Sequence, residues 1–163
     1  MDTPIPSPIQ INESHPPAVL FKLVNPLMNF LLRSPLHGLV DSRLLLLRWR
    51  GRKTGQAYTI PVGYQQAGTT ITLFTFSGWQ ANFREPHPVM VKLNGKWQAG
   101  TGVIRGDERK TATFIARAAA EGGQAAYRRF RMEVKGERAP TIDELIPEVR
   151  KRKLVLVTIT LNA

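Results

Sequence analysis

A short basic segment of this 163-residue chain carries the residue types best suited to bind an anion. Four of the six residues from 48 to 53 are basic. Gly51 and Gly55 mark the two ends of a short loop that contains two of these four residues. Glycine reaches positive φ without steric cost, so the loop can turn its backbone N–H groups inward as an anion-binding nest. Arg52, Lys53 and the hydroxyl of Thr54 add charge and a further donor. The loop suits a phosphate or carboxylate; the plainer interpretation is a solvated hairpin tip whose charges protect a sheet edge.

The residues on either side of this loop predict a β-hairpin. A run of four leucines, 44–47, and then Trp49 precede the loop. After it, Tyr58, Ile60 and Val62 alternate with polar or small residues, which is the period of a strand with one buried face. The basic loop is therefore expected at the tip of two paired strands.

The rest of the chain offers few groups for catalysis by side chains alone. It has no cysteine, which excludes disulfides, a thiol nucleophile and Cys-ligated metals. His15, His37 and His87 are scattered without metal-ligand spacing, so no metal site is expected. No catalytic triad or pair of carboxylates can be nominated either. A cofactor that performs the chemistry, with the protein supplying binding and orientation, fits this composition.

Charge indicates the kind of partner. The net charge is +11, and residues 41–104 alone hold eight basic and two acidic side chains. Such a field attracts a phosphorylated cofactor, nucleic acid or an acidic membrane surface. The hydrophobic content of 42% excludes a disordered chain. We expect a flexible Pro-rich arm over 1–16 and a single domain over 17–163.

The segment 18–32 is mostly apolar and contains Pro26. It predicts a kinked helix or two short helices, too short to span a bilayer comfortably. Two roles are open for residues 19–32: packing on the domain, or peripheral contact with the inner face of a membrane. The start of the chain lacks the pattern of a secretory signal, so a cytoplasmic location is expected.

The remaining pattern predicts an α+β, mainly β fold. Expected strands cover 69–76, 89–93, 96–104 and 154–161, with an Asn94-Gly95 hairpin turn. Gly100 and Gly102 indicate a bend or a close backbone approach. Helices are expected from an Asp107 cap to Ala120, over 124–133, and from a Thr141 capping box, with a polar linker over 135–140. Together these elements predict a small antiparallel barrel of about six strands with flanking helices.

The sequence GRKTG at 51–55, followed by Pro61, resembles the deazaflavin-dependent nitroreductase family. The resemblance extends over roughly residues 24–161. It implies a split β-barrel related to the FMN-binding split barrels. It also implies transfer of a hydride from reduced coenzyme F-420 to a small organic acceptor such as a quinone, nitroaromatic or enone.

The resemblance further implies a set of site residues. Ser77-Gly78 falls beside the deazaflavin ring, the segment 79–83 is similar to a W-x-x-N-L motif, and Tyr127 forms a wall on the acceptor side. Catalytic roles are expected for Ser77 and Tyr127. Cofactor contacts are expected from Arg52, Lys53, Thr54, Gly55, Pro61, Ser77, Gly78, Trp79 and Asn82. Trp79 and Tyr127 also suit ordinary packing, and Asn82 equally suits fixing the loop backbone.

Three alternatives to a deazaflavin enzyme remain open from the sequence. The chain could be an FMN- or haem-binding split barrel, or a cofactor carrier without catalysis. It could also be a basic nucleic-acid-binding module, although no RNP-type motif or helix-turn-helix is visible. A homodimer is left open as well.

Overall fold

The computed structural model describes residues 9–14 and 44–163. They belong to two compact units: a barrel unit, residues 44–105 and 155–163, and a helical unit, residues 9–14 and 106–154. The expected helix within 18–32 and its two alternative roles lie outside the described residues. In the part of the chain that is described, no helix is both long and apolar enough to cross a membrane. The interpretation of 17–163 as one domain stays a prediction.

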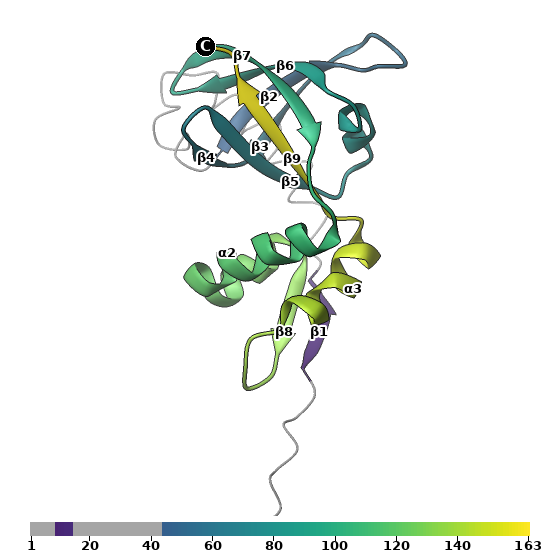
Figure 1. The fold of residues 1–163 in the computed structure, drawn as a ribbon, viewed down its shortest axis with the longest axis vertical. Helices are drawn as coiled ribbons and strands as arrows, with labels where there is room; N and C mark the ends of the chain where they lie inside the picture. Colours follow the sequence, from purple (N-terminus) through teal and green to yellow (C-terminus); the bar gives the residue numbers. More distant parts are fainter. Residues whose placement is uncertain (1–8, 15–43) are drawn as a thin grey trace, which may run out of the picture. The chain divides into compact units, whose positions relative to one another are not determined.

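The barrel unit is built on one antiparallel sheet of seven strands, ordered β3-β2-β6-β7-β9-β5-β4 (Figure 1). The expected hairpins at 44–64 and 89–104 are confirmed as β2–β3 and β6–β7. The closing strand inserts between β7 and β5. The bounds are β2 Leu44–Arg50, β3 Ala57–Gly63, β4 Gln65–Ala67, β5 Thr70–Thr75, β6 His87–Leu93, β7 Lys96–Ile104 and β9 Val155–Leu161.

The chain itself forces this sheet to curl. β3 and β4 stand at opposite ends of the strand order, yet only Tyr64 separates Gly63 from Gln65. The two ends of the sheet must therefore meet at this point, which a flat sheet of seven strands cannot do. The predicted fold class is confirmed: a mainly β, α+β fold whose antiparallel sheet curls into a barrel, accompanied by helices.

Alternation along the strands fills the inside of the curled sheet. In β2, Leu45, Leu47 and Trp49 are buried, whereas Arg48 and Arg50 are exposed. The apolar side chains of this core come from five elements and are Leu45, Leu47, Trp49, Ile71, Leu73, Phe83, Val89, Val91, Leu93, Val157, Ile159 and Leu161.

The two glycines of β7 confirm the expected close approach. A Cβ on Gly100 would lie 2.8 Å from the carbonyl oxygen of Thr160 in β9. A Cβ on Gly102 would lie 2.9 Å from two ring atoms of Phe83. The missing side chains therefore let β9 and the Phe83 ring pack directly against β7.

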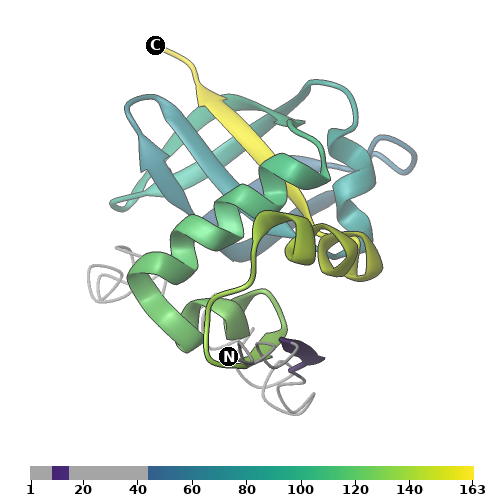
Figure 2. The ribbon, with the colours of Figure 1, turned by 60° about the horizontal axis from the view of Figure 1, so that its bottom comes forward.

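The helical unit contains α2 (Glu108–Arg129), α3 (Ile142–Arg152) and a two-stranded sheet of β1 (Gln10–Glu13) and β8 (Met132–Lys135). The predicted cap is confirmed, because the Asp107 carboxylate accepts from the Lys110 N–H at 2.9 Å. Gly123, at φ 55° and ψ −140°, interrupts α2 where the sequence predicts a break. The bend is visible in Figure 2.

The end of the predicted helix over 124–133 is wrong. The helix stops at Arg129, and residues 132–135 form strand β8, where the end of that helix and the start of a polar linker were expected. The Gln124 side chain accepts from the Val134 N–H and donates to the Val134 carbonyl, occupying the outer edge of β8. On the other edge lies β1, which belongs to the segment expected as an N-terminal arm. A local sequence pattern cannot show that this segment pairs with residues near 134.

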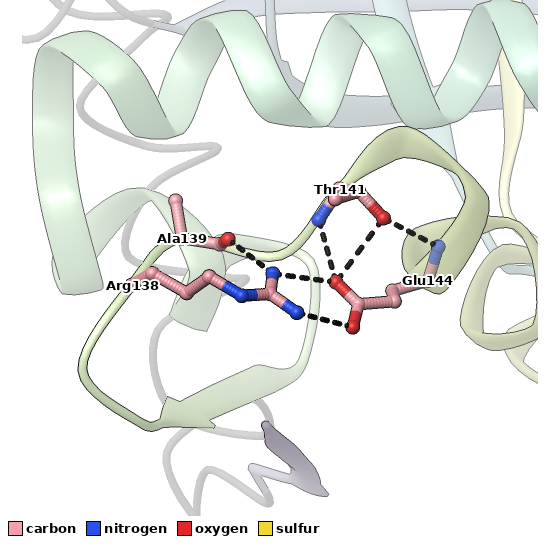
Figure 3. A network of polar contacts seen from close by, with 4 residues as sticks. All are labelled: Arg138, Ala139, Thr141 and Glu144. Atoms are coloured by element: carbon pink, nitrogen blue, oxygen red, sulfur yellow. Dashed lines mark hydrogen bonds and ion pairs between the residues drawn. The ribbon is translucent and has the colours of Figure 1, made fainter. Parts of the chain in front are cut away.

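Helix α3 begins with the predicted capping box. The Glu144 N–H donates to Thr141 Oγ1 at 3.3 Å, and the Thr141 N–H donates to the Glu144 carboxylate at 2.8 Å. Arg138 adds two guanidinium bonds to the same carboxylate, at 2.8 and 2.9 Å (Figure 3). A single acidic side chain thus joins the helix start to the segment before it.

Candidate functional site

The basic loop closes tightly on itself. The Gly51 N–H donates to the Gln56 carbonyl and the Gly55 N–H to the Gly51 carbonyl, both at 2.8 Å. Gly55 adopts the positive φ of 66° that the sequence indicated. Because its N–H is used inside the turn, Gly55 shapes the loop and has no backbone donor left for an anion.

A cavity of about 590 Å³ opens beside this loop. One side is the loop with the start of β3, and the other is the 3₁₀ helix η2 (Gly78–Phe83), with Trp49 of β2 between them. The lining residues are Trp49, Gly51, Arg52, Lys53, Thr54, Tyr58, Ile60, Trp79, Ala81 and Asn82.

Aromatic rings form the apolar wall of the cavity. Trp49 stacks on Tyr58 with centroids 5.3 Å apart, and Trp79 lies 5.3 Å from Trp49 at a tilt of 40°. Phe83 supports both tryptophans edge-on from the core. Tyr58 is 37% exposed although it belongs to this cluster. The wall is therefore broad, rigid and partly open, as a planar ligand requires.

Trp49 also carries an unusual polar atom. The residue is only 3% exposed, and its Nε1 is buried without a hydrogen-bond partner among the described residues. A buried N–H left unpaired is costly. Because the nitrogen itself is buried, it does not meet a ligand in the cavity in this conformation.

The rim of the cavity is positively charged. None of the lining residues is acidic, and Arg52 and Lys53 stand at the loop. Residues 44–105 and 155–163 together contain eight basic side chains and only one acidic one, Glu85. No salt bridge in the described part of the barrel unit neutralises Lys53. An anionic ligand is therefore attracted to this end of the barrel.

The other two arginines of the basic segment do not line the cavity. Arg48 lies over the Trp97 ring, 4.1 Å from its centroid, and donates to Thr59 Oγ1 at 3.2 Å. Arg50 donates to the Gly55 carbonyl at 3.1 Å. Alternation along β2 directs both to the face opposite Trp49.

Arg52 and Asn82 connect the two sides of the cavity. The Arg52 N–H donates to Asn82 Oδ1 at 3.0 Å, and Arg52 Nε donates to the Asn82 carbonyl at 2.7 Å. Asn82 Nδ2 in turn donates to the Trp79 carbonyl at 2.9 Å. The alternative role predicted for Asn82, fixing the loop backbone, is thus present in the structure.

His87 contacts two residues that adjoin the cavity-lining ones, Arg50 and Phe83. Its Nε2 lies 2.6 Å from the Arg50 carbonyl, which can only accept, so Nε2 carries the proton. Its ring meets the Phe83 ring edge-on at 5.8 Å. The sequence marked His87 only as a histidine without metal partners, and its contact with the end of β2 depends on the pairing of distant segments.

The predicted site residues of the barrel unit divide into two groups. Arg52, Lys53, Thr54, Trp79 and Asn82 converge on the cavity, and Gly55 completes the same loop. Ser77, Gly78 and Pro61 belong to the barrel unit but do not line the cavity.

Ser77, Pro61 and Tyr127 occupy distinct environments. The half-buried Ser77 caps η2 through its backbone carbonyl, which accepts from the Gln80 N–H at 3.1 Å. Pro61 lies in β3, an edge strand, where its missing N–H is tolerated. Tyr127 belongs to α2 of the helical unit, is 6% exposed, and has its pKa raised by burial.

Sequence reasoning missed five of the residues that line the cavity: Trp49, Gly51, Tyr58, Ile60 and Ala81. Trp49 and Tyr58 face each other across the β2–β3 register, and Ile60 lies one step further on the same face of β3. The alternation that predicts the hairpin therefore contained this signal. Gly51 was assigned to the turn alone, yet it is buried, and a Cβ there would lie 2.9 Å from Thr54 Oγ1 and 3.1 Å from the Tyr58 ring. Ala81 had no local signal.

No family profile and no curated protein matches the sequence. Among solved structures, a candidate pyridoxamine 5′-phosphate oxidase from Listeria innocua is 10% identical, with 81% of this chain and 94% of that chain covered and a TM-score of 0.47. An F-420 reductase is 11% identical, covering 83% and 93%, with a TM-score of 0.39. A FAD- and heme-binding protein from Mycobacterium smegmatis is 14% identical, covering 80% and 67%, with a TM-score of 0.41. These are weak structural similarities, and none of them assigns a ligand or reaction to this chain.

Proposed function

We propose that this protein is an oxidoreductase that binds coenzyme F-420 in the cavity beside the basic loop and reduces a small organic acceptor. The observation that carries the proposal is the combination, in one cavity of about 590 Å³, of an aromatic wall and a cationic rim without a carboxylate. That volume lies within the range of roughly 300–1,000 Å³ typical of ligand pockets.

The residues of the cavity fit the chemical parts of such a cofactor. A planar ring system suits the wall of Trp49, Tyr58 and Trp79, because aromatic faces stack. A phosphate suits the side of Lys53 and Thr54, where charge-assisted hydrogen bonds are stronger than neutral ones.

When bound, the deazaflavin would supply a hydride, and the protein would bind, orient and shield the reactants. In this proposal Lys53 and the Thr54 hydroxyl hold the phosphate. Ser77 donates to a carbonyl or nitro oxygen of the acceptor, and the acceptor-side role of Tyr127 stays a prediction. Gly55, Pro61 and Gly78 act through the backbone path of the loops and strand that carry the contacting side chains.

FMN is the alternative cofactor, because it shares the planar ring and the phosphate that support the proposal. A carrier that binds the cofactor without turnover uses the same cavity. A haem-type ligand would be distinguished by its absorption spectrum.

The deciding experiment is titration of the purified protein with coenzyme F-420 and, separately, with FMN, followed by tryptophan and cofactor fluorescence. We expect saturable quenching by F-420 that is largely lost in Trp79→Phe. Trp97→Phe serves as the matched control, since Trp97 stacks on Arg48 and does not line the cavity. Quenching by FMN alone would transfer the proposal to a flavin enzyme. No saturable binding of either compound would refute the proposal.

A further inference from the structure

We propose that Arg52 is a positioning residue: its guanidinium clamps the end of η2 and the residues after it against the basic loop and so sets the shape of the cavity. The inference rests on the proposed function only in treating this cavity as the ligand site. It assigns to Arg52 a role different from that of Lys53, although both are basic neighbours on one loop.

Three backbone carbonyls accept from the Arg52 side chain. Nε donates to Asn82 at 2.7 Å, and Nη2 donates to both Glu85 and Pro86 at 2.8 Å. These acceptors lie 30 to 34 positions along the chain from Arg52. A planar guanidinium presents several donors in a fixed fork, which a single ammonium group does not reproduce.

Asn82 completes the connection in the opposite direction. Its Oδ1 accepts from the Arg52 N–H at 3.0 Å, while its Nδ2 donates to the Trp79 carbonyl at 2.9 Å. The chain of bonds from Arg52 through Asn82 to Trp79 links the cationic rim to the aromatic wall. Displacement of the 79–86 segment would therefore move Trp79 and change the width of the cavity.

The same bonds limit what Arg52 can offer an anion. Its backbone N–H, Nε and Nη2 all have protein acceptors, so only Nη1 is without a bond among the described residues. Lys53 lines the same cavity and forms no hydrogen bond or ion pair within the described part of the chain. We therefore assign contact with the anion to Lys53 and the shape of the cavity to Arg52.

The first test uses the protein without ligand. We expect Arg52→Lys, which keeps the charge and loses the fork, to accelerate amide hydrogen exchange across residues 78–86 by about tenfold or more. Strands β6, β7 and β9 should keep wild-type protection, which checks that the variant is folded. Arg84→Lys is the matched control, because Arg84 is exposed in the same segment and forms no bond among the described residues. Unchanged exchange over 78–86 in Arg52→Lys would overturn the clamp.

Asn82→Ala provides a second variant should Arg52→Lys fail to fold. It removes the acceptor for the Arg52 N–H and the donor to Trp79, so exchange at the Arg52 amide should rise. Wild-type protection of that amide in Asn82→Ala would also count against the clamp.

The second test is titration of both Arg52 variants with coenzyme F-420. If Arg52 positions the cavity, Arg52→Lys and Arg52→Ala should weaken binding to a similar degree. If it instead contacts the anion by charge, Arg52→Lys would bind nearly as wild type and only Arg52→Ala would lose affinity, which overturns the inference. Failure of the wild-type protein to bind F-420 would refute the proposed function, while the exchange experiment would still decide the role of Arg52.

Discussion

Lys53 brings to the cavity a charge that no acidic side chain among the described residues pairs with. Charge-assisted hydrogen bonds contribute about 1.5–3 kcal/mol each. Lys53→Ala should therefore weaken F-420 binding about tenfold or more while leaving the melting temperature unchanged. Lys96→Ala removes the same charge at the start of β7, away from the cavity, and should bind as wild type. Equal affinities of the two variants in fluorescence titration would contradict the assignment of Lys53.

Gly102 lies where a single methyl group should disturb both the core and the site. Its added Cβ would meet the ring of Phe83, which is fully buried and supports Trp49 and Trp79. Overpacking of this kind costs about 1–3 kcal/mol, so we expect Gly102→Ala to lower the free energy of unfolding by that amount. Gly78→Ala is the control, because its Cβ would meet nothing within 4 Å. Urea denaturation compares the two variants. Equal midpoints would show that the Phe83 ring moves aside without a loss of stability.

Ser77 and Tyr127 are tested by turnover. Ser77 is half-buried, and its side chain makes no capping bond to η2, which leaves the hydroxyl for the proposed acceptor. Burial raises the pKa of Tyr127, so its phenol stays protonated near neutral pH. Ser77→Ala and Tyr127→Phe should lower turnover modestly, well below the roughly 3–4 kcal/mol of a donor that stabilises developing charge, with F-420 affinity nearly unchanged.

The assay for these two variants is oxidation of reduced F-420, followed by absorbance, with menadione and a nitroaromatic as separate acceptors. Tight F-420 binding without oxidation by any acceptor in the wild-type protein would indicate a carrier.

At the scale of elements, the start of α3 should make the helical unit sensitive to acid. Hydrogen bonds from Arg138, and then from the Thr141 backbone, lower the pKa of Glu144 from its ordinary 4.5 to about 2. Because the folded-state pKa is lowered, this contribution to stability is complete above about pH 4.5 and disappears as the pH falls towards 2. Glu144→Gln should thus destabilise the protein near neutral pH and differ little from wild type near pH 2.

The control for this prediction is the neighbouring residue. Asp143 pairs with Arg109, but their side chains are 77% and 60% exposed, so Asp143→Asn should change stability little. Thr141→Ala removes the other half of the capping box and should cost about 1 kcal/mol near neutral pH. Circular dichroism across a pH series measures all three variants. A Glu144→Gln deficit that persists at low pH would show that the effect is not electrostatic.

At the scale of the whole molecule, the net charge of +11 predicts two different salt dependences. Nucleic acid would meet many basic side chains, and its affinity would fall about 10³–10⁵-fold between 50 and 200 mM salt if six to ten phosphates are contacted. An F-420 phosphate held by Lys53 involves one or two cations, so its affinity should fall far less. Anisotropy of labelled duplex DNA and F-420 titration at the two salt concentrations test this. A DNA affinity that falls this steeply with salt would favour the nucleic-acid-binding alternative.

The sequence by itself determined most of the local elements of this protein, with strands β1 and β8 as exceptions. Alternation of apolar residues predicted the paired strands on either side of residue 53, and the glycine at position 55 predicted the turn. The capping residues Asp107 and Thr141 predicted where two helices start. Each of these signals acts between residues close in the chain, where backbone sterics and nearby side-chain hydrogen bonds decide the outcome. The barrel class followed from the succession of short strands.

Only the tertiary structure decided which distant segments meet. β1 pairs with β8 more than a hundred residues later, and β9 inserts between β7 and β5. Arg52 shows the consequence at the site: its sequence context predicted an anion ligand, whereas its acceptors are carbonyls of residues 82, 85 and 86. A local pattern fixes strand period and turn conformation. The choice among distant partners depends on which pairing buries the apolar faces and satisfies the polar groups together, and that is settled only when the whole sheet closes.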